Sequence, residues 1–172
     1  SEFDKQNMVG GWFDTSMPDM NMCNPYLLKY FTQAAIWWIE WADIDGIRVD
    51  TYPYNDKMPM TEWCKAIRNE YPNFNIVGEV YTSHVAQLAY WQGGAVNADG
   101  FNSGLPSVMD FPLHNGMCQG INADYVNWDE GLVKVYDALS NDAYYANPMN
   151  MMVFCSNHDT DRLGDVVRRD PE

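Results

Sequence analysis

In the first half of the chain, apolar residues recur at helical spacing in two segments, and between these lies a short segment in which apolar and polar residues alternate as in a strand. Asn24-Pro25 is typical of a helix start, an N-cap residue followed by proline. The residues that follow repeat at helical spacing: Leu27, Phe31, Ala34, Trp38 and Trp41. A turn over 43–46 leads into a predicted strand, Gly46–Asp50, where apolar and polar residues alternate. A second helix is predicted by Trp63, Ile67 and Tyr71 and ends before Pro72-Asn73.

The second half continues this alternation. A strand is predicted over Asn75–Val80, and Ser83 is expected to cap a helix that ends at Gly93-Gly94. A less clearly marked strand covers Ser107–Phe111. Asn127 with Glu130 three residues later resembles a capping box, placed before apolar residues at helical spacing: Leu132, Val135 and Leu139. Met151–Cys155 is the fourth predicted strand.

Four strands separated by helices predict parallel β-α-β crossovers and therefore an α/β fold. Acidic residues stand at or near the end of each predicted strand: Asp50, Glu79, Asp110 and Asp159. The carboxyl ends of parallel strands are where ligand chemistry is found in barrels and in open α/β sheets. We therefore expect a functional site at this edge of the sheet.

Composition and charge narrow the classes of partner. The 172 residues are 47% hydrophobic, which is enough for a real core, and carry a formal net charge of −14. Ten lysines and arginines cannot form a basic footprint, which argues against nucleic acid and against an anionic membrane surface. Aromatic residues make up 15% of the chain, a composition that permits stacking on sugars but equally fits core packing.

The four cysteines do not form a recognisable site. Cys23, Cys64, Cys118 and Cys155 lie far apart in sequence, without the C-x₂-C spacing of zinc or redox motifs. Isolated, half-buried thiols are the expectation, and the redox compartment stays open.

Arg48 and Asp50 form the first candidate group. They stand two apart on one strand, so their side chains point to the same face. A guanidinium beside a carboxylate favours the ionised form, as a nucleophile requires. A plain internal ion pair is the alternative.

Glu79 ends the otherwise apolar strand Asn75–Val80. Burial there disfavours the charged form, so its pKa should rise, as suits a general acid. A glutamate that simply reaches solvent is the alternative.

His158-Asp159 follows the fourth strand. Adjacent residues of a strand end point in different directions, so we expect hydrogen bonding to a substrate rather than a shared metal. The sequence contains neither a histidine-rich zinc cluster nor an EF-hand loop, and it lacks the G-x-S-x-G elbow of a serine hydrolase.

In their order along the chain, these segments resemble the motifs of the α-amylase family of glycoside hydrolases. Gly46–Asp50 is similar to the nucleophile motif and Gly78–Val80 to the acid/base motif. Ser156–Thr160 is similar to the closing motif. Met17–Asn21 resembles the extra motif of the neopullulanase and cyclomaltodextrinase branch. The resemblance implies a (β/α)₈ TIM barrel that cleaves α-glucosidic bonds with retention.

The resemblance assigns roles by position. Asp50 would be the nucleophile, Glu79 the acid/base, and Asp159 the third acid that binds sugar hydroxyls in the transition state. Retention requires the Asp50 and Glu79 carboxyl groups to lie about 5–5.5 Å apart. Contacts with substrate are expected from four further residues: Arg48, Tyr54, His158 and Arg162. An arginine exposed at the surface is the alternative for Arg162.

Two departures from the family pattern sharpen these expectations. Pro53 and Tyr54 occupy the positions at which many α-amylases have Lys-His, which favours the neopullulanase-like branch. The family's first motif is absent, and a complete barrel needs about 250 residues. We therefore expect residues 1–172 to form the C-terminal part of a catalytic barrel, about strands four to seven, without a separate second domain.

Further expectations follow from the resemblance and from this partial barrel. Starch-type substrates are expected: maltooligosaccharides, cyclodextrins or pullulan. No cofactor is expected; many members of the family bind calcium, but no calcium site is assigned to these residues. An open half-barrel favours a homodimer or strand-exchanged oligomer and little activity of the piece alone. The polymeric substrate favours a periplasmic or secreted location. An α-glucan transglycosylase and a non-catalytic glycan-binding relative are the alternative functions. A relative without catalytic activity would be expected to lack at least one of Asp50, Glu79 and Asp159, and all three are present.

Overall fold

The computed structural model describes residues 1–123 and 127–163. Three parallel strands form an open sheet in the order β1-β2-β3. The elements are, in chain order, α1 (Glu2–Val9), α2 (Pro25–Ala42), β1 (Gly46–Val49), η1 (Tyr52–Tyr54), α3 (Lys57–Glu70), β2 (Asn75–Gly78), α4 (Val85–Trp91), β3 (Ser107–Val108), α5 (Phe111–Ile121), α6 (Val133–Leu139), η2 (Ser140–Tyr144) and η3 (Pro148–Asn150). The predicted α/β class with parallel crossovers is confirmed.

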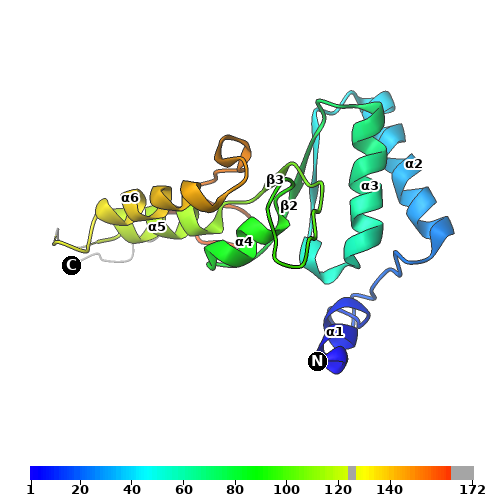
Figure 1. Ribbon diagram of the computed structural model, residues 1–172. Coiled ribbons are helices and arrows are strands. Elements are labelled where there is room, and N and C mark those ends of the chain that lie inside the picture. The colour runs from blue at the N-terminus through cyan, green and yellow to red at the C-terminus, as the bar shows by residue number, and fades with distance from the viewer. Residues whose placement is uncertain (124–126, 164–172) are drawn as a thin grey trace.

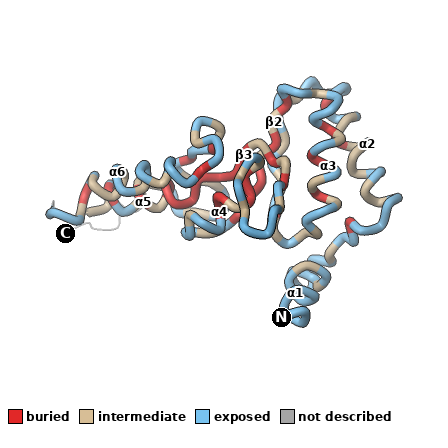
Figure 2. The backbone as a smooth tube through the Cα atoms, viewed as in Figure 1, coloured by how far each residue is buried: buried red, intermediate tan, exposed pale blue. Residues whose placement is uncertain are grey.

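The helices lie in two groups on either side of this sheet. In Figure 1, α2 and α3 lie side by side at one end of the molecule, while α5 and α6 form a pair at the other. Buried residues gather along the sheet and the inner side of α3, whereas α1 has no buried residue (Figure 2). The described part of the chain is therefore elongated, with the sheet at its middle. None of its helices has the length and apolar character needed to cross a membrane.

The strand register brings the ends of β1 and β2 level. Arg48 pairs with Val77, and Val49 with Gly78, so the residues after the two strands are also neighbours. Ile76 and Val108 are fully buried in the main core. A Cβ on Gly78 would lie 2.6 Å from Leu105 Cδ2 and 3.1 Å from Tyr52 Cγ, so a larger residue here would force these buried side chains to shift.

The fourth predicted strand, Met151–Cys155, is wrong as a strand within the described residues. Only Met152 pairs, in parallel, with Met109. Its N–H donates to the Val108 carbonyl and its own carbonyl accepts from Asp110 N–H, each at 2.9 Å. Helix α5 begins at Phe111, so there is no strand beyond Asp110 for residues 153–155 to pair with. The third predicted strand, Ser107–Phe111, is shortened to two residues for the same reason.

Two of the three predicted helix starts are also wrong. The Asn24 side chain does cap α2, accepting from Tyr26 N–H at 3.0 Å, as predicted. Ser83 does not cap α4, whose N-cap is His84. The capping box at Asn127 does not form, because Gly131 takes a left-handed φ of 78° and the helix begins only at Val133.

Asp110 is a structural residue rather than a member of the site. Its buried carboxylate caps α5 by accepting from Leu113 N–H at 3.0 Å. Burial raises the pKa of Asp110, and the bond from Leu113 opposes that rise. Asp110 therefore binds its proton more tightly in the folded state than in the unfolded chain. This contribution to stability is fully present below the unfolded pKa and is lost as the pH rises through the folded pKa.

We expect Asp110→Asn to keep the cap and remove this penalty. Its free energy of unfolding relative to wild type should rise between pH 4 and pH 7, as measured by urea unfolding at each pH. Asp110→Ala should be about 1 kcal/mol less stable than Asp110→Asn at either pH, because it lacks a capping oxygen. Asp137→Asn, at an exposed position of α6, is the control. A flat pH dependence for Asp110→Asn would show that the buried carboxylate carries no such penalty.

Candidate active site

The site begins at the end of β1, where an arginine and an aspartate share one face of the strand. Arg48 Nη1 donates to Asp50 Oδ1 at 2.7 Å, which confirms the predicted contact. The Asp50 side chain is 57% exposed and that of Arg48 is 29% exposed. Asp50 is therefore both held by a cation and open to a ligand.

Glu79 follows β2 directly and is the buried member of the group. Its side chain is 6% exposed, and Oε1 accepts from Arg48 Nη2 at 2.8 Å. Oε2 accepts from the backbone N–H of Thr51 at 2.9 Å. The prediction of burial is confirmed, and both carboxylate oxygens have polar partners.

Thr51 is a residue that the sequence analysis missed. Its backbone is left-handed, with φ 46° and ψ 40°, a conformation that β-branched residues rarely take. This turn directs the Thr51 N–H at the Glu79 carboxylate. Nothing in the sequence signals the turn, since glycine or asparagine would be the usual marker.

The segment of the predicted third acid forms a compact turn of its own. Asp159 Oδ2 lies 3.1 Å from His158 Nε2, so the expectation that these neighbours point apart is wrong. The turn bends the chain, with Asp159 N–H donating to Asn157 Oδ1 at 2.9 Å. Arg162 Nη1 donates to Ser156 Oγ at 3.1 Å and closes the same segment. These contacts do not join Asp159 or Arg162 to the Arg48 network.

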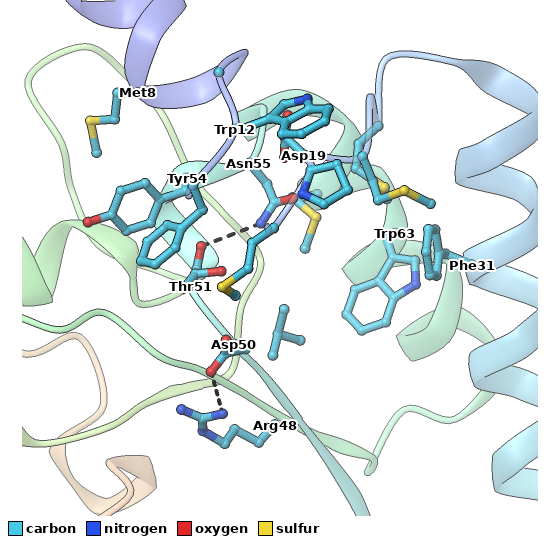
Figure 3. A pocket seen from close by; sticks show the side chains of 18 of the residues that line it. Met8, Trp12, Asp19, Phe31, Arg48, Asp50, Thr51, Tyr54, Asn55 and Trp63 are labelled. Carbon is cyan, nitrogen blue, oxygen red and sulfur yellow. Dashed lines mark hydrogen bonds and ion pairs between the residues drawn. The ribbon is translucent and has the colours of Figure 1, made fainter. Parts of the chain in front are cut away.

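A pocket of about 690 Å³ opens beside Asp50. Figure 3 shows Arg48 and Asp50 at one side of it and Trp12 and Asp19 at the other. Met17, Pro18, Asp19 and Met20 all line this pocket, so the segment resembling a branch motif is brought to the nucleophile candidate from about thirty positions away in sequence. The size is within the usual range of small-molecule sites, about 300–1,000 Å³.

Tyr54 lies in the wall of the same pocket. It follows Asp50 by four residues through the 3₁₀ turn Tyr52–Tyr54. Its ring meets Phe13 edge to face, with centroids 5.3 Å apart. Phe13 and Trp12, both exposed, were also missed by the sequence analysis, because their segment shows no apolar period. The pocket thus presents aromatic rings next to a carboxylate.

Histidine, cysteine and acidic side chains are the groups that could hold a metal ion. Among residues 1–123 and 127–163, no group of three or more histidine, cysteine or acidic side chains is arranged to hold a metal ion. The four cysteines are free thiols: Cys64 is buried, Cys118 is half-buried, and Cys23 and Cys155 are exposed.

Comparisons with known proteins identify relatives of this chain. The family described as "Alpha amylase, catalytic domain" matches residues 4–172. The intracellular maltogenic amylase of Bacillus subtilis (strain 168) is 29% identical over 158 residues, covering 92% of this chain and 25% of the relative. A cyclomaltodextrinase of Geobacillus thermopakistaniensis is 26% identical over 153 residues, covering 88% of this chain and 24% of that protein.

A solved structure supports the same relationship in three dimensions. The α-amylase of Geobacillus thermoleovorans in complex with acarbose superposes with a TM-score of 0.78 and 27% identity, covering 98% of this chain and 35% of that one. The chain thus spans about a quarter of the length of the two curated relatives and about a third of this structure. The sheet and helices correspond to part of a (β/α)₈ barrel, as expected from the motifs. The chain belongs to the α-amylase catalytic-domain family.

Proposed function

We propose that the protein to which this chain belongs hydrolyses α-glucosidic bonds with retention, using Asp50 as nucleophile and Glu79 as acid/base. The observation that carries the proposal is the single guanidinium of Arg48, which bonds both carboxylates across adjacent strands. Two acids around one cation at the carboxyl edge of a parallel sheet fit the paired-carboxylate chemistry of retaining glycosidases.

The two acids differ in the way that the reaction requires. Asp50 is exposed in the pocket and ion-paired, which suits attack on the anomeric carbon as the glycosidic bond breaks. Glu79 is buried and fixed by Arg48 and Thr51, so a proton on it would be delivered to the leaving oxygen from one defined position. In the second step Glu79 takes a proton from the water that releases the sugar from Asp50.

Asp159 is proposed as the third acid, with His158 beside it. Both groups can bond sugar hydroxyls, and their mutual contact of 3.1 Å holds them together on one turn. Arg162 fixes the turn through Ser156 and is proposed to contact substrate only from there. All three acids are present in this sequence, which favours a catalytic protein over a non-catalytic glycan-binding relative.

Maltooligosaccharides and cyclodextrins are the proposed substrates. The pocket beside Asp50 is lined by aromatic and methionine side chains with few charges, as suits a neutral sugar whose C–H face stacks on rings. Tyr54 stands where many family members have histidine, so we propose that it contacts the sugar next to the cleaved bond. The names of the two relatives, maltogenic amylase and cyclomaltodextrinase, support this class of substrate.

Covalent trapping tests the nucleophile directly. A fluorinated α-maltosyl fluoride, which has an activated leaving group and turns over slowly, should add one maltosyl unit to the peptide that contains Asp50, as found by mass spectrometry of a digest. Asp50→Asn should abolish the label, and Asp45→Asn, in an exposed turn, should keep it. Labelling that persists in Asp50→Asn would count against the assignment. Turnover of unactivated maltotriose by this chain alone is expected to be very low.

A double-mutant cycle tests the network. Arg48→Met leaves the buried Glu79 carboxylate without its cation and should cost about 1–3 kcal/mol of unfolding free energy. Combining it with Glu79→Gln should cost clearly less than the sum of the two single changes. The matched cycle of Arg48→Met with Asp50→Asn should show a coupling below about 1 kcal/mol, because that pair is exposed. Equal couplings in the two cycles would contradict the proposed arrangement.

Oligomerisation is a separate proposal, based on the edge of the sheet. Within the described residues β1 pairs only with β2, so its other edge offers free backbone groups to a second copy. Multi-angle light scattering should show a mass that rises from one chain toward two with concentration. A constant monomer mass at high concentration would overturn this proposal.

A further inference from the structure

A lysine at the start of α3 lies among three aromatic rings. Lys57 Nζ lies over the ring of Tyr90, 4.5 Å from its centroid. The centroids of Phe101 and Trp91 are 5.0 and 5.7 Å from the same nitrogen, and all three distances are within the range of cation–π attraction. The ammonium group also donates to the Tyr90 hydroxyl and forms an ion pair with Asp99 Oδ2 at 3.9 Å. Lys57 and these four side chains are referred to below as the Lys57 cluster.

The three rings also pack on one another, which gives the cluster a fixed shape. Tyr90 and Phe101 stack with centroids 5.4 Å apart and planes inclined at 24°. Trp91 meets both of them edge to face, at 5.4 and 5.8 Å. The side-chain amide of Asn97 donates to the carbonyls of Tyr90 and Phe101, each at 2.9 Å, and so ties the loop after α4 to the helix. The cation of α3 is therefore attracted to an ordered surface of α4 and the loop that follows it.

This cluster reaches the candidate active site through Trp91. The Trp91 ring meets that of Tyr52 edge to face, with centroids 5.7 Å apart, and both side chains are buried. Tyr52 directly follows Thr51, whose backbone N–H donates to Glu79 Oε2 at 2.9 Å. The rings that Lys57 holds therefore support the residue next to one of the donors of the buried acid.

The segment from Tyr52 to Lys57 rests on the cluster at both of its ends. Tyr52 begins the 3₁₀ turn Tyr52–Tyr54, and Lys57 is the first residue of α3. The N-cap residue of α3, Asp56, does not cap the helix with its side chain. The start of the helix therefore depends on contacts with other elements, and Lys57 supplies a contact with α4.

We propose that Lys57 is a positioning residue for proton transfer by Glu79, an inference that rests on the proposed function. Lys57 acts through the rings of its cluster, which support Tyr52 and with it the Thr51 turn. Without the cation, the rings lose their attraction to the start of α3, and the turn gains freedom. The Thr51 N–H then meets the Glu79 carboxylate for a smaller fraction of the time.

Asp50 lies outside this series of contacts. Arg48, on the same strand, holds it through a bond of 2.7 Å. Loss of the Lys57 cation should therefore slow the step in which Glu79 takes a proton from water and spare the attack by Asp50. A general loss of stability would affect both steps, so the split between them distinguishes positioning from a purely structural role.

Hydrogen exchange of the ¹⁵N-labelled chain, followed by NMR, tests the link to Thr51 without requiring turnover. The Lys57 side chain is 45% exposed, so Lys57→Met should fold while losing the cation. The Thr51 amide should exchange about tenfold faster in this variant, because the turn opens more often. The amide of Ile67, buried in α3, should be unchanged. Lys57→Arg keeps a cation over the rings and should restore slow exchange.

A matched control, Lys65→Met, changes a lysine at an exposed position of the same helix and should leave the exchange of Thr51 unchanged. Equal exchange of the Thr51 amide in wild type and Lys57→Met would refute the inference. Faster exchange of Thr51 and Ile67 together would also refute it, because that result reports a general loss of stability.

The fluorinated α-maltosyl fluoride separates the two chemical steps. Fluoride leaves readily, so labelling of Asp50 needs little help from an acid, whereas release of the label needs Glu79 to activate water. In Lys57→Met the label should form at the wild-type rate and be lost about tenfold more slowly, as followed by mass spectrometry, with Lys57→Arg close to wild type. Unchanged release, or equal slowing of both steps, would contradict the inference. If wild type takes up no label, the proposed function fails, whereas the exchange of the Thr51 amide still decides whether Lys57 holds that donor in place.

Discussion

The guanidinium of Arg48, bonded to Asp50 on one side and Glu79 on the other, is the interaction on which the site depends. A buried carboxylate without a partner costs several kcal/mol, so the 6% exposed side chain of Glu79 needs a cation and a further donor beside it. Arg48 and the Thr51 N–H supply both. The same cation holds Asp50, which means that one side chain sets the positions of two acids.

This arrangement requires the backbone register below it. Because Val49 pairs with Gly78, the residues that follow the two strands stand next to each other. The Glu79 N–H donates to the Val49 carbonyl at 2.9 Å, and the Tyr52 N–H donates to the Glu79 carbonyl at 3.0 Å. A slip of one residue would turn one acid to the opposite face of the sheet and separate the pair. Packing fixes the register from the other face, since Gly78 fits closely against Leu105 and Tyr52.

The extent to which sequence predicted structure follows from how local each interaction is. The α2 start and the Arg48–Asp50 contact were correctly predicted because both depend on residues within three positions of each other. The fourth strand failed because its pairing depends on where β3 ends, and the cap at Asp110 decides that. The two carboxylates could be named from their motifs, but their shared cation could not, because a contact across 31 residues is set by the strand register.

Thr51 shows what such long-range constraints can impose. A left-handed backbone at a β-branched residue costs about 1–3 kcal/mol, so it persists only where its surroundings determine it. Here the next residue, Tyr52, is fully buried, and its N–H is bonded to the carbonyl of Glu79. Tyr52 thereby anchors the chain one residue beyond the turn, while Asp50 is held by Arg48 one residue before it. With both neighbours fixed, the peptide between them must turn sharply, and the N–H it exposes meets the carboxylate oxygen that Arg48 leaves free. The strain at Thr51 is thus a consequence of fixing two acids around one cation, and it completes the set of donors that keeps the buried acid in place.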